Sequence, residues 1–367
     1  MSDTPSSSLP VLDLADVRST DPAARARAEE AVRAGLGHYG LIYIRSHGLD
    51  GALLDAFYDD FLSLCARPEA EKQTWASGDI WYQRGWTPPN TEKAVIAGGQ
   101  PDFKECFFIA PEPLDEDLRD VYPEIYAENR WPADSASFQE RYLALGHAIH
   151  AVGMQVLEVA ATSLGLPAET FAERTEGGPH VTRALRYLPL DAQQAADASI
   201  VWGEEHTDFN LLTLLPGGRF FDASGAPCAR PDAQSGLYLR TRPTEQHPKG
   251  ELVHGAPPAG CIVAQVGQQL EILTGGAFLA TPHVITAPST PGYARTSMAH
   301  FIHVHSLQQL FPLPAFRTPE ARRSYGPPVL AGTYSLKTLV DIGLAPREAL
   351  DQLGYRHYGR LDAIRFS

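Results

Sequence analysis

Hydrophobic positions recur at helical spacing in the first half of the chain. Between residues 138 and 164, apolar side chains lie three or four positions apart, which predicts a long helix with one buried stripe. Residues 22–36 and 51–66 are predicted as two further helices. Two short apolar runs, 9–14 and 40–44, are predicted as strands. The first half therefore combines helices with a few strands.

From about residue 180 the pattern changes to short β-prone runs separated by Gly and Pro. Several short strands at such spacing are typical of a sandwich or barrel. No linker rich in Pro and Ser separates the two halves, so we expect one interlocked unit over 1–367 rather than two domains. Residues 1–8 are predicted as a disordered tail. The predicted strands of the second half are 181–188, 211–215, 236–240, 261–266, 270–273, 277–280 and 295–305.

Charge and composition narrow the function classes. The chain has 367 residues, 44 of them acidic and 30 basic, and a formal net charge of −14. This balance argues against a nucleic-acid scaffold, which would carry a basic face, and it suits a small-molecule substrate. There is neither a secretory signal nor a run of 18 apolar residues, so we expect no membrane span. The chain should be cytoplasmic, and a monomer and a homodimer are both open.

The four cysteines, Cys65, Cys106, Cys228 and Cys261, show no CxxC spacing. A zinc or redox motif is therefore not expected, and free thiols in a reducing cytoplasm are the simplest interpretation.

The segment after residue 205 carries the candidate chemistry. His206 and Asp208 are two positions apart, so on an extended chain their side chains point the same way and can share one metal ion. His283, after another apolar run, is the leading candidate for a third ligand. Two imidazoles and one carboxylate leave three positions open, as in non-haem Fe(II) oxygenases. Taken alone the pair is weak, because a surface turn gives the same spacing.

A second pair follows the third candidate ligand. Arg295 and Ser297 are also two positions apart and begin a β-prone run. A guanidinium and a hydroxyl at this spacing can jointly hold a carboxylate, with the arginine binding it through two parallel hydrogen bonds.

With these motifs in place, the chain resembles the isopenicillin-N-synthase-like family of Fe(II)- and 2-oxoglutarate-dependent oxygenases over nearly its whole length. Residues 9–110 resemble the family's N-terminal region, and 180–310 its iron and 2-oxoglutarate region. The motifs that carry the resemblance are "LPVLDL" at 9–14, "GLIYIRSHGL" at 40–49, "PDFKECFFI" at 101–109, "ENRWP" at 128–132, "VGQQLEILTGGAFLATPHVI" at 266–285 and "RTS" at 295–297.

The resemblance implies a double-stranded β-helix (jelly-roll) core with an α-helical N-terminal wrap. It implies that His206, Asp208 and His283 bind Fe(II), and that Arg295 and Ser297 bind the distal carboxylate of 2-oxoglutarate. The cosubstrates would be 2-oxoglutarate and O2, and the products succinate and CO2. Oxidation of a small molecule would end in hydroxylation, desaturation or ring formation. An acidic ligand at Asp208 argues against halogenation, since related halogenases have Gly or Ala there.

The chain departs from the family in two places. Arg186-Tyr187-Leu188-Pro189 stands where many plant relatives read Asn-Tyr-Tyr-Pro, so the usual second Tyr is missing. Arg186 could instead bind the iron-side carboxylate of 2-oxoglutarate or a substrate acid. His283 follows Asp208 by 75 positions (283 − 208), a long interval that looks most like the bacterial ethylene-forming enzyme branch. Because residues 91–98 do not match that enzyme's arginine-binding residues, its substrate is not transferred.

Several other residues have a functional and a structural interpretation. Arg84 could contact an acidic substrate or stack on Trp at the surface, and Phe209 could line the pocket or pack in the core. Tyr187 is a further candidate substrate contact. For Lys104 and Glu105 we expect solvated charges or structural ion pairs. Polar or packing roles are also favoured for His147, His150, His300, His303, His305, Glu204 and Glu205.

Two other functions remain open from the sequence. One is an oxidase of the same fold that needs no 2-oxoglutarate and binds a substrate carboxylate at Arg295 and Ser297. The other is a non-catalytic β-sandwich binding protein. The complete set of three candidate metal ligands argues against this second function.

Overall fold

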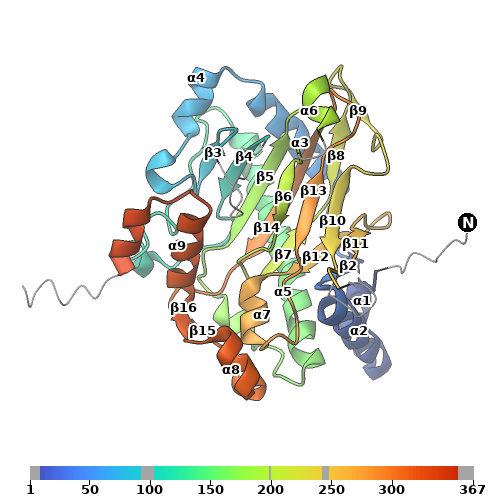
Figure 1. Ribbon diagram of the computed structural model, residues 1–367, viewed down its shortest axis with the longest axis vertical. Coiled ribbons are helices and arrows are strands. Elements are labelled where there is room, and N and C mark those ends of the chain that lie inside the picture. Colours follow the sequence, from blue (N-terminus) through green and yellow to red (C-terminus); the bar gives the residue numbers. More distant parts are fainter. Residues whose placement is uncertain (1–8, 92–102, 198–199, 242–247, 354–367) are drawn as a thin grey trace, which may run out of the picture.

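A computed structural model describes residues 9–91, 103–197, 200–241 and 248–353 (Figure 1). The strands are β1 Val11–Asp13, β2 Leu41–Arg45, β3 Gly85–Thr87, β4 Lys104–Ile109, β5 Val181–Tyr187, β6 Gly203–His206, β7 Leu212–Leu215, β8 Gly218–Phe221, β9 Pro227–Cys228, β10 Gly236–Arg240, β11 Leu252–His254, β12 Ile262–Val266, β13 His283–Thr286, β14 Ala294–Ile302, β15 Gln309–Leu310 and β16 Val329–Leu330. The helices are α1 Leu14–Val17, α2 Pro22–Ala34, α3 Gly51–Cys65, α4 Glu69–Lys72, α5 Ala136–Ser163, α6 Ala192–Ala196, α7 Gln268–Leu273, α8 Pro319–Tyr325 and α9 Ala331–Asp341. Residues 1–8, the predicted tail, lie outside the described residues.

Two sheets form the centre of the fold. The larger has ten strands along the path β1-β2-β12-β7-β14-β5-β4-β3, with β8 paired to β14 and to β9. The smaller has the order β11-β10-β13-β6. Side chains of both sheets line one internal cavity, which confirms the predicted double-stranded β-helix. The N-terminal strands β1 and β2 extend the larger sheet beside β12.

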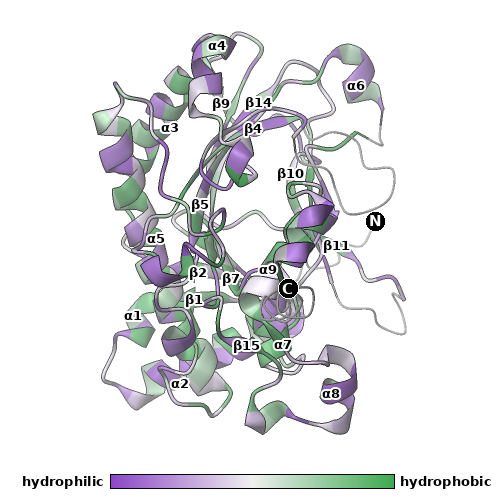
Figure 2. Cartoon of the chain, turned by 90° about the vertical axis from the view of Figure 1, so that its left-hand side faces the viewer, coloured by the Kyte–Doolittle hydropathy of each residue, from purple (hydrophilic) through white to green (hydrophobic). Residues whose placement is uncertain are grey.

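Helices α2, α3 and α5 cover the outer side of the larger sheet, whereas β10 and β11 lie on its other side (Figure 2). The predicted stripe on α5 is confirmed: Tyr142, Leu145, Ile149, Val152 and Val156 are all buried. By length and composition α5 could also span a membrane. Its apolar face packs against β7 and β14, which accounts for its hydropathy.

An aromatic cluster joins this helix layer to the sheet. Phe57 of α3, Phe107 of β4 and Phe138 of α5 pack around Tyr142. The Tyr142 hydroxyl donates to the carbonyl of Phe107 and accepts from the backbone N–H of Ala184 on β5. It therefore fixes β4 and β5, two strands that line the site described below.

Two of the predicted strands are wrong. Residues 268–273 form helix α7 because Leu270 and Leu273, three apart, both turn into the core. Residues 277–280 form an irregular segment after Gly275 and Gly276, whose positive φ angles of 58° and 85° end the helix. The last predicted strand is confirmed as β14, but it ends at Ile302, so His303 and His305 follow it.

Candidate active site

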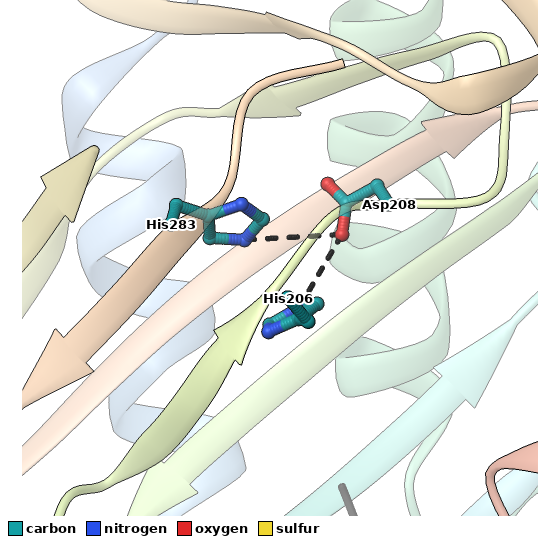
Figure 3. A group of neighbouring side chains, drawn as sticks. All are labelled: His206, Asp208 and His283. Carbon is teal, nitrogen blue, oxygen red and sulfur yellow. Dashed lines mark ion pairs between the residues drawn. The ribbon is translucent and has the colours of Figure 1, made fainter. Parts of the chain in front are cut away.

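The structure brings the three candidate metal ligands together (Figure 3). His206 ends β6, Asp208 follows it, and His283 begins β13, whose register pairs His283 directly with His206. Nε2 of His206 lies 3.5 Å and Nε2 of His283 3.8 Å from Oδ1 of Asp208. Atoms that each bind one ion at about 2.1 Å can be no more than about 4.2 Å apart, so both distances suit a shared metal.

Hydrogen bonds orient the ligand side chains. Nδ1 of His206 lies 2.7 Å from the Glu204 carbonyl and donates to it, which leaves the Nε2 lone pair for a metal. Nδ1 of His283 lies 2.6 Å from the side-chain amide of Gln265, whose oxygen has no partner. A half-turn of that amide lets the oxygen accept from Nδ1–H, so Nε2 of His283 is free as well. Thr213 donates to the second oxygen of Asp208. The residues therefore fit Fe(II).

Burial and mutual charge set the protonation of the site. Burial and the charge of His206 lower the pKa of His283 to about 4, which keeps this imidazole neutral at neutral pH. Burial alone would raise the pKa of Asp208, but the charges that His283 and His206 carry when protonated, together with hydrogen bonds from His206 and Thr213, hold it well below its usual range. A neutral imidazole and an ionised carboxylate are the forms that bind a metal.

Two cavities meet at the ligands. The first, about 220 Å³, extends from His206 and Asp208 toward Phe209, His303 and helix α9. The second, about 280 Å³, runs between the two sheets to Arg295 and Ser297. The candidate ligands therefore stand between an inner cavity that reaches the predicted carboxylate-binding pair and an outer cavity covered by C-terminal residues.

The register of β5 and β14 explains what lines the inner cavity. Arg295 pairs with Tyr187 and Ser297 with Leu185, and directly paired residues share a face. Tyr187 lies beside the Arg295 guanidinium, 5.6 Å from ring centroid to Cζ, and stacks on Trp202. Although the second Tyr of the plant motif is missing, a tyrosine side chain thus stands next to the predicted carboxylate-binding arginine.

Arg186 is not brought to this cavity. It pairs with Thr296, so it lies on the opposite face of the sheet from Arg295. Its guanidinium donates to the buried Glu105 carboxylate at 2.7 Å, and Lys72 and Trp86 donate to the other oxygen of Glu105. The expected ion-pair role of Glu105 is confirmed, while the suggested contact of Arg186 with 2-oxoglutarate has no support in this geometry.

Arg183 is the arginine of β5 that lines both cavities, with its guanidinium between the rings of Phe108 and Phe301. Lys104 lines both cavities too, where the sequence suggested a solvated charge or an ion pair. Sequence reasoning missed Arg183, yet the signal was present: it lies two and four positions before Leu185 and Tyr187, on the same face of a strand.

The three candidate substrate contacts have different surroundings. Arg84 lines the outer cavity but is fully buried, and its guanidinium donates to the carbonyls of Gln83, Ile125 and Ala127. The interpretation of Arg84 as a surface cation is therefore wrong. Phe209 lines the outer cavity and also packs on a core cluster, so both interpretations hold. Tyr187 belongs to the inner cavity.

Most other histidines have structural partners. His147 pairs with Glu112, His305 pairs with Asp115, and the ring of His150 contacts that of His300. His303 differs, since it lines the outer cavity. Glu205 pairs with Arg240, as a structural charge would, whereas Glu204 lines the outer cavity.

Comparison with known proteins agrees with this geometry. Residues 179–304 match the family described as the 2OG-Fe(II) oxygenase superfamily, and residues 9–134 match the family described as the non-haem dioxygenase in morphine synthesis N-terminal region. The chain belongs to the 2OG-Fe(II) oxygenase superfamily. It is a non-haem dioxygenase whose cofactors are Fe(II) and 2-oxoglutarate, with an isopenicillin-N-synthase-like N-terminal region. The finer boundaries, 9–110 and 180–310, stay a prediction.

Similar proteins occur in bacteria and fungi. Validamycin A dioxygenase of Streptomyces hygroscopicus subsp. limoneus is 27% identical over 84% of this chain and 80% of that protein. The 2-oxoglutarate-dependent dioxygenase imqE of Aspergillus flavus is 25% identical over 89% of this chain and 92% of its own. The crystal structure of a 2OG-Fe(II) oxygenase family protein from Caulobacter crescentus has a TM-score of 0.73 at 25% identity, covering 91% of this chain and 99% of that chain. This likeness agrees with the fold described above.

Proposed function

We propose that this protein hydroxylates a compact small molecule in the outer cavity, coupled to decarboxylation of 2-oxoglutarate to succinate and CO2 in the inner one. The observation that carries the proposal is the position of His206, Asp208 and His283 at the junction of the two cavities. Iron with 2-oxoglutarate and O2 supplies the oxidising power when bound. The protein's part is to hold and orient the reactants.

The residues have distinct parts in this proposal. His206, Asp208 and His283 would hold Fe(II) where the two cavities meet. Arg295 and Ser297 hold the distal carboxylate of 2-oxoglutarate, so that its keto end points to the metal. Aromatic and aliphatic side chains of the outer cavity, such as Phe209 and Leu339, exclude water and place a substrate C–H bond near the metal.

The test is succinate formation from 2-oxoglutarate under O2 by protein reconstituted with Fe(II), with and without candidate substrates. We expect slow formation without substrate and a faster rate with one. His206→Ala and Asp208→Ala should abolish it while the fold, followed by circular dichroism, is retained. Absence of succinate from the wild-type protein would refute the proposal, and substrate-dependent O2 uptake without 2-oxoglutarate would favour the oxidase instead.

We also propose the bacterial ethylene-forming enzyme layout for this chain, on the 75-position interval between Asp208 and His283. Ethylene in the headspace of the same reaction would support it, and its absence would leave the hydroxylase proposal intact. A cytoplasmic location and a monomer or homodimer are retained as proposals. The lack of disulfides among the four cysteines supports the first of these.

A further inference from the structure

The outer cavity contains a histidine whose ring has no polar partner. His303 is 6% exposed, directly follows β14 and lines the cavity with its ring centroid 5.4 Å from that of Phe209. Its ring makes no hydrogen bond with any described residue, and Nδ1 is shielded from solvent. Its backbone N–H donates to Nδ1 of His180, which fixes the peptide in place. A buried polar group left without a partner costs about 1–3 kcal/mol, so its retention here calls for a ligand.

Asn210 provides a second group of this kind in the same cavity. It is 1% exposed, and its side chain meets the hydroxyl oxygen of Thr213 at 3.2 Å, whose single hydrogen is donated to Asp208. Its Nδ2 is buried and has no partner among the described residues. A half-turn of the amide lets the nitrogen donate to the Thr213 oxygen, which leaves the side-chain oxygen of Asn210 as a buried acceptor without a partner among the described residues.

The protonation of His303 limits what it can bind. Burial and the nearby positive charge of Arg84 lower the pKa of His303 to about 3, so its ring is neutral at physiological pH. A neutral imidazole offers one donor and one acceptor. Together with the amide of Asn210, it complements a group that itself offers both a carbonyl and an N–H.

The rest of the wall favours a ring without net charge. Phe108, Phe209 and Phe301 supply flat apolar surface, and the charged side chains of the wall are of both signs: Glu204 and Asp208 against Arg84, Lys104 and Arg183. The cations Lys104 and Arg183 stand where the two cavities join, on the side of the anionic cosubstrate. His303 and Asn210 line the outer cavity but not the inner one.

We propose that His303 and Asn210 determine the specificity of the outer cavity by binding the amide or imide edge of a neutral ring compound. This inference rests on the proposed function, because it assigns the outer cavity to the substrate. The N–H of the compound donates to the side-chain oxygen of Asn210, and its carbonyl accepts from the ring N–H of His303. The ring body lies against the phenylalanines and is thereby turned toward the metal ligands.

Calorimetric titration of the anaerobic protein loaded with Fe(II) and 2-oxoglutarate tests this inference. The probes are uracil, orotate, which adds a carboxylate to the same ring, and cyclohexylamine as a cation. Wild-type protein should bind uracil at least ~10-fold more tightly than either of the others. His303→Phe keeps a ring but removes both nitrogens, and should weaken uracil at least ~10-fold, the value of one hydrogen bond. His303→Gln should recover most of that loss, because an amide again supplies a donor and an acceptor.

His305→Gln is the matched control, since His305 lies two positions on and pairs with Asp115 away from the cavity. It should leave uracil binding unchanged. Three results would overturn the inference. His303→Phe could bind uracil as tightly as wild type does, wild type could bind orotate or cyclohexylamine more tightly than uracil, or uracil could fail to bind at all. The visible absorption of the Fe(II)–2-oxoglutarate complex separates the two failures. If wild type lacks it, the proposed function fails; if it is present without uracil binding, only the specificity inference fails.

Discussion

The buried carboxylate of Glu105 should be one of the main electrostatic supports of the fold. Its side chain is 2% exposed and accepts hydrogen bonds from Lys72 at 3.0 Å, Trp86 at 2.9 Å and Arg186 at 2.7 Å. Glu105→Gln preserves the shape but removes the negative charge. Lys72, whose side chain is only 10% exposed, then keeps only the 62% exposed Glu69, 3.7 Å away, as a counterion among the described residues. Removing one partner of a buried ion pair costs about 3–5 kcal/mol.

We expect the lower end of that range for Glu105→Gln, about 3 kcal/mol, because the Gln oxygen still accepts one hydrogen bond. An unfolding entropy of roughly 2.1 cal/mol/K per residue gives about 0.8 kcal/mol/K for 367 residues. The expected loss in Tm is therefore about 4 °C, measured by scanning calorimetry at pH 7. Glu30→Gln is the control, since Glu30 pairs with Arg33 at the surface with a 72% exposed side chain and should shift Tm far less.

The same hydrogen-bond network determines how the difference in Tm between wild type and Glu105→Gln depends on pH. Burial raises the pKa of Glu105, but hydrogen bonds from Lys72, Trp86 and Arg186 outweigh it, so the folded pKa lies below the ordinary value of 4.5. A carboxyl group whose pKa is lower in the folded than in the unfolded protein stabilises the fold at any pH above its unfolded-state pKa. This stabilisation is lost as the pH falls through the folded-state pKa. Wild type and Glu105→Gln should therefore converge below pH 4.5. A Gln variant that melts within 1 °C of wild type at pH 7, where we predict about 4 °C, would refute the reasoning.

Three further predictions concern the two cavities and the metal ligands. Arg295→Gln should raise the KM for 2-oxoglutarate at least ~10-fold, the value of one charge-assisted hydrogen bond. Arg186→Met should lower Tm with little change in that KM, as steady-state kinetics and melting curves would show. The reverse pattern would indicate that Arg186, not Arg295, binds 2-oxoglutarate. Gln265→Leu removes the amide beside the third ligand and should weaken Fe(II) binding by about 10–100-fold in a metal titration; unchanged affinity would show that the amide does not orient the imidazole. Gly218→Ala places a Cβ 2.2 Å from a backbone oxygen of β14 and should cost about 2–3 kcal/mol and raise the KM for 2-oxoglutarate. Gly51→Ala, whose Cβ would meet no atom within 4 Å, should be tolerated.

Short-range regularity predicted the β core and the paired candidate residues, whereas the assignment of His283 as a ligand and the double-stranded β-helix came from the family resemblance. A spacing of two residues on a strand placed His206 with Asp208 and Arg295 with Ser297, and both pairs do share a cavity wall. The same regularity was not applied to β5. Arg186 lies in the Arg-Tyr-Leu-Pro segment but on the face of the sheet opposite Arg295. Counting alternate residues back from Tyr187 leads instead to Arg183.

Other errors arose where tertiary packing decides. The run 270–273 reads as a strand by composition, yet Gly267 and the buried pair Leu270 and Leu273 make it a helix. Arg84 next to aromatic residues suggested a contact with an acidic substrate or a surface cation, but the backbone carbonyls of Gln83, Ile125 and Ala127 hold it inside. For His303 the sequence favoured a polar or packing role, because its lack of a partner is visible only once the cavity is known.

Anaerobic titration of the protein with Fe(II) in the presence of 2-oxoglutarate tests the central claim most directly. If His206, Asp208 and His283 hold iron beside a chelating ketoacid, a visible charge-transfer band should grow and saturate at one iron per chain. Asp208→Ala should lack the band under the same conditions. A wild-type protein that shows no band, or an Asp208→Ala protein with the wild-type band and affinity, would contradict the account.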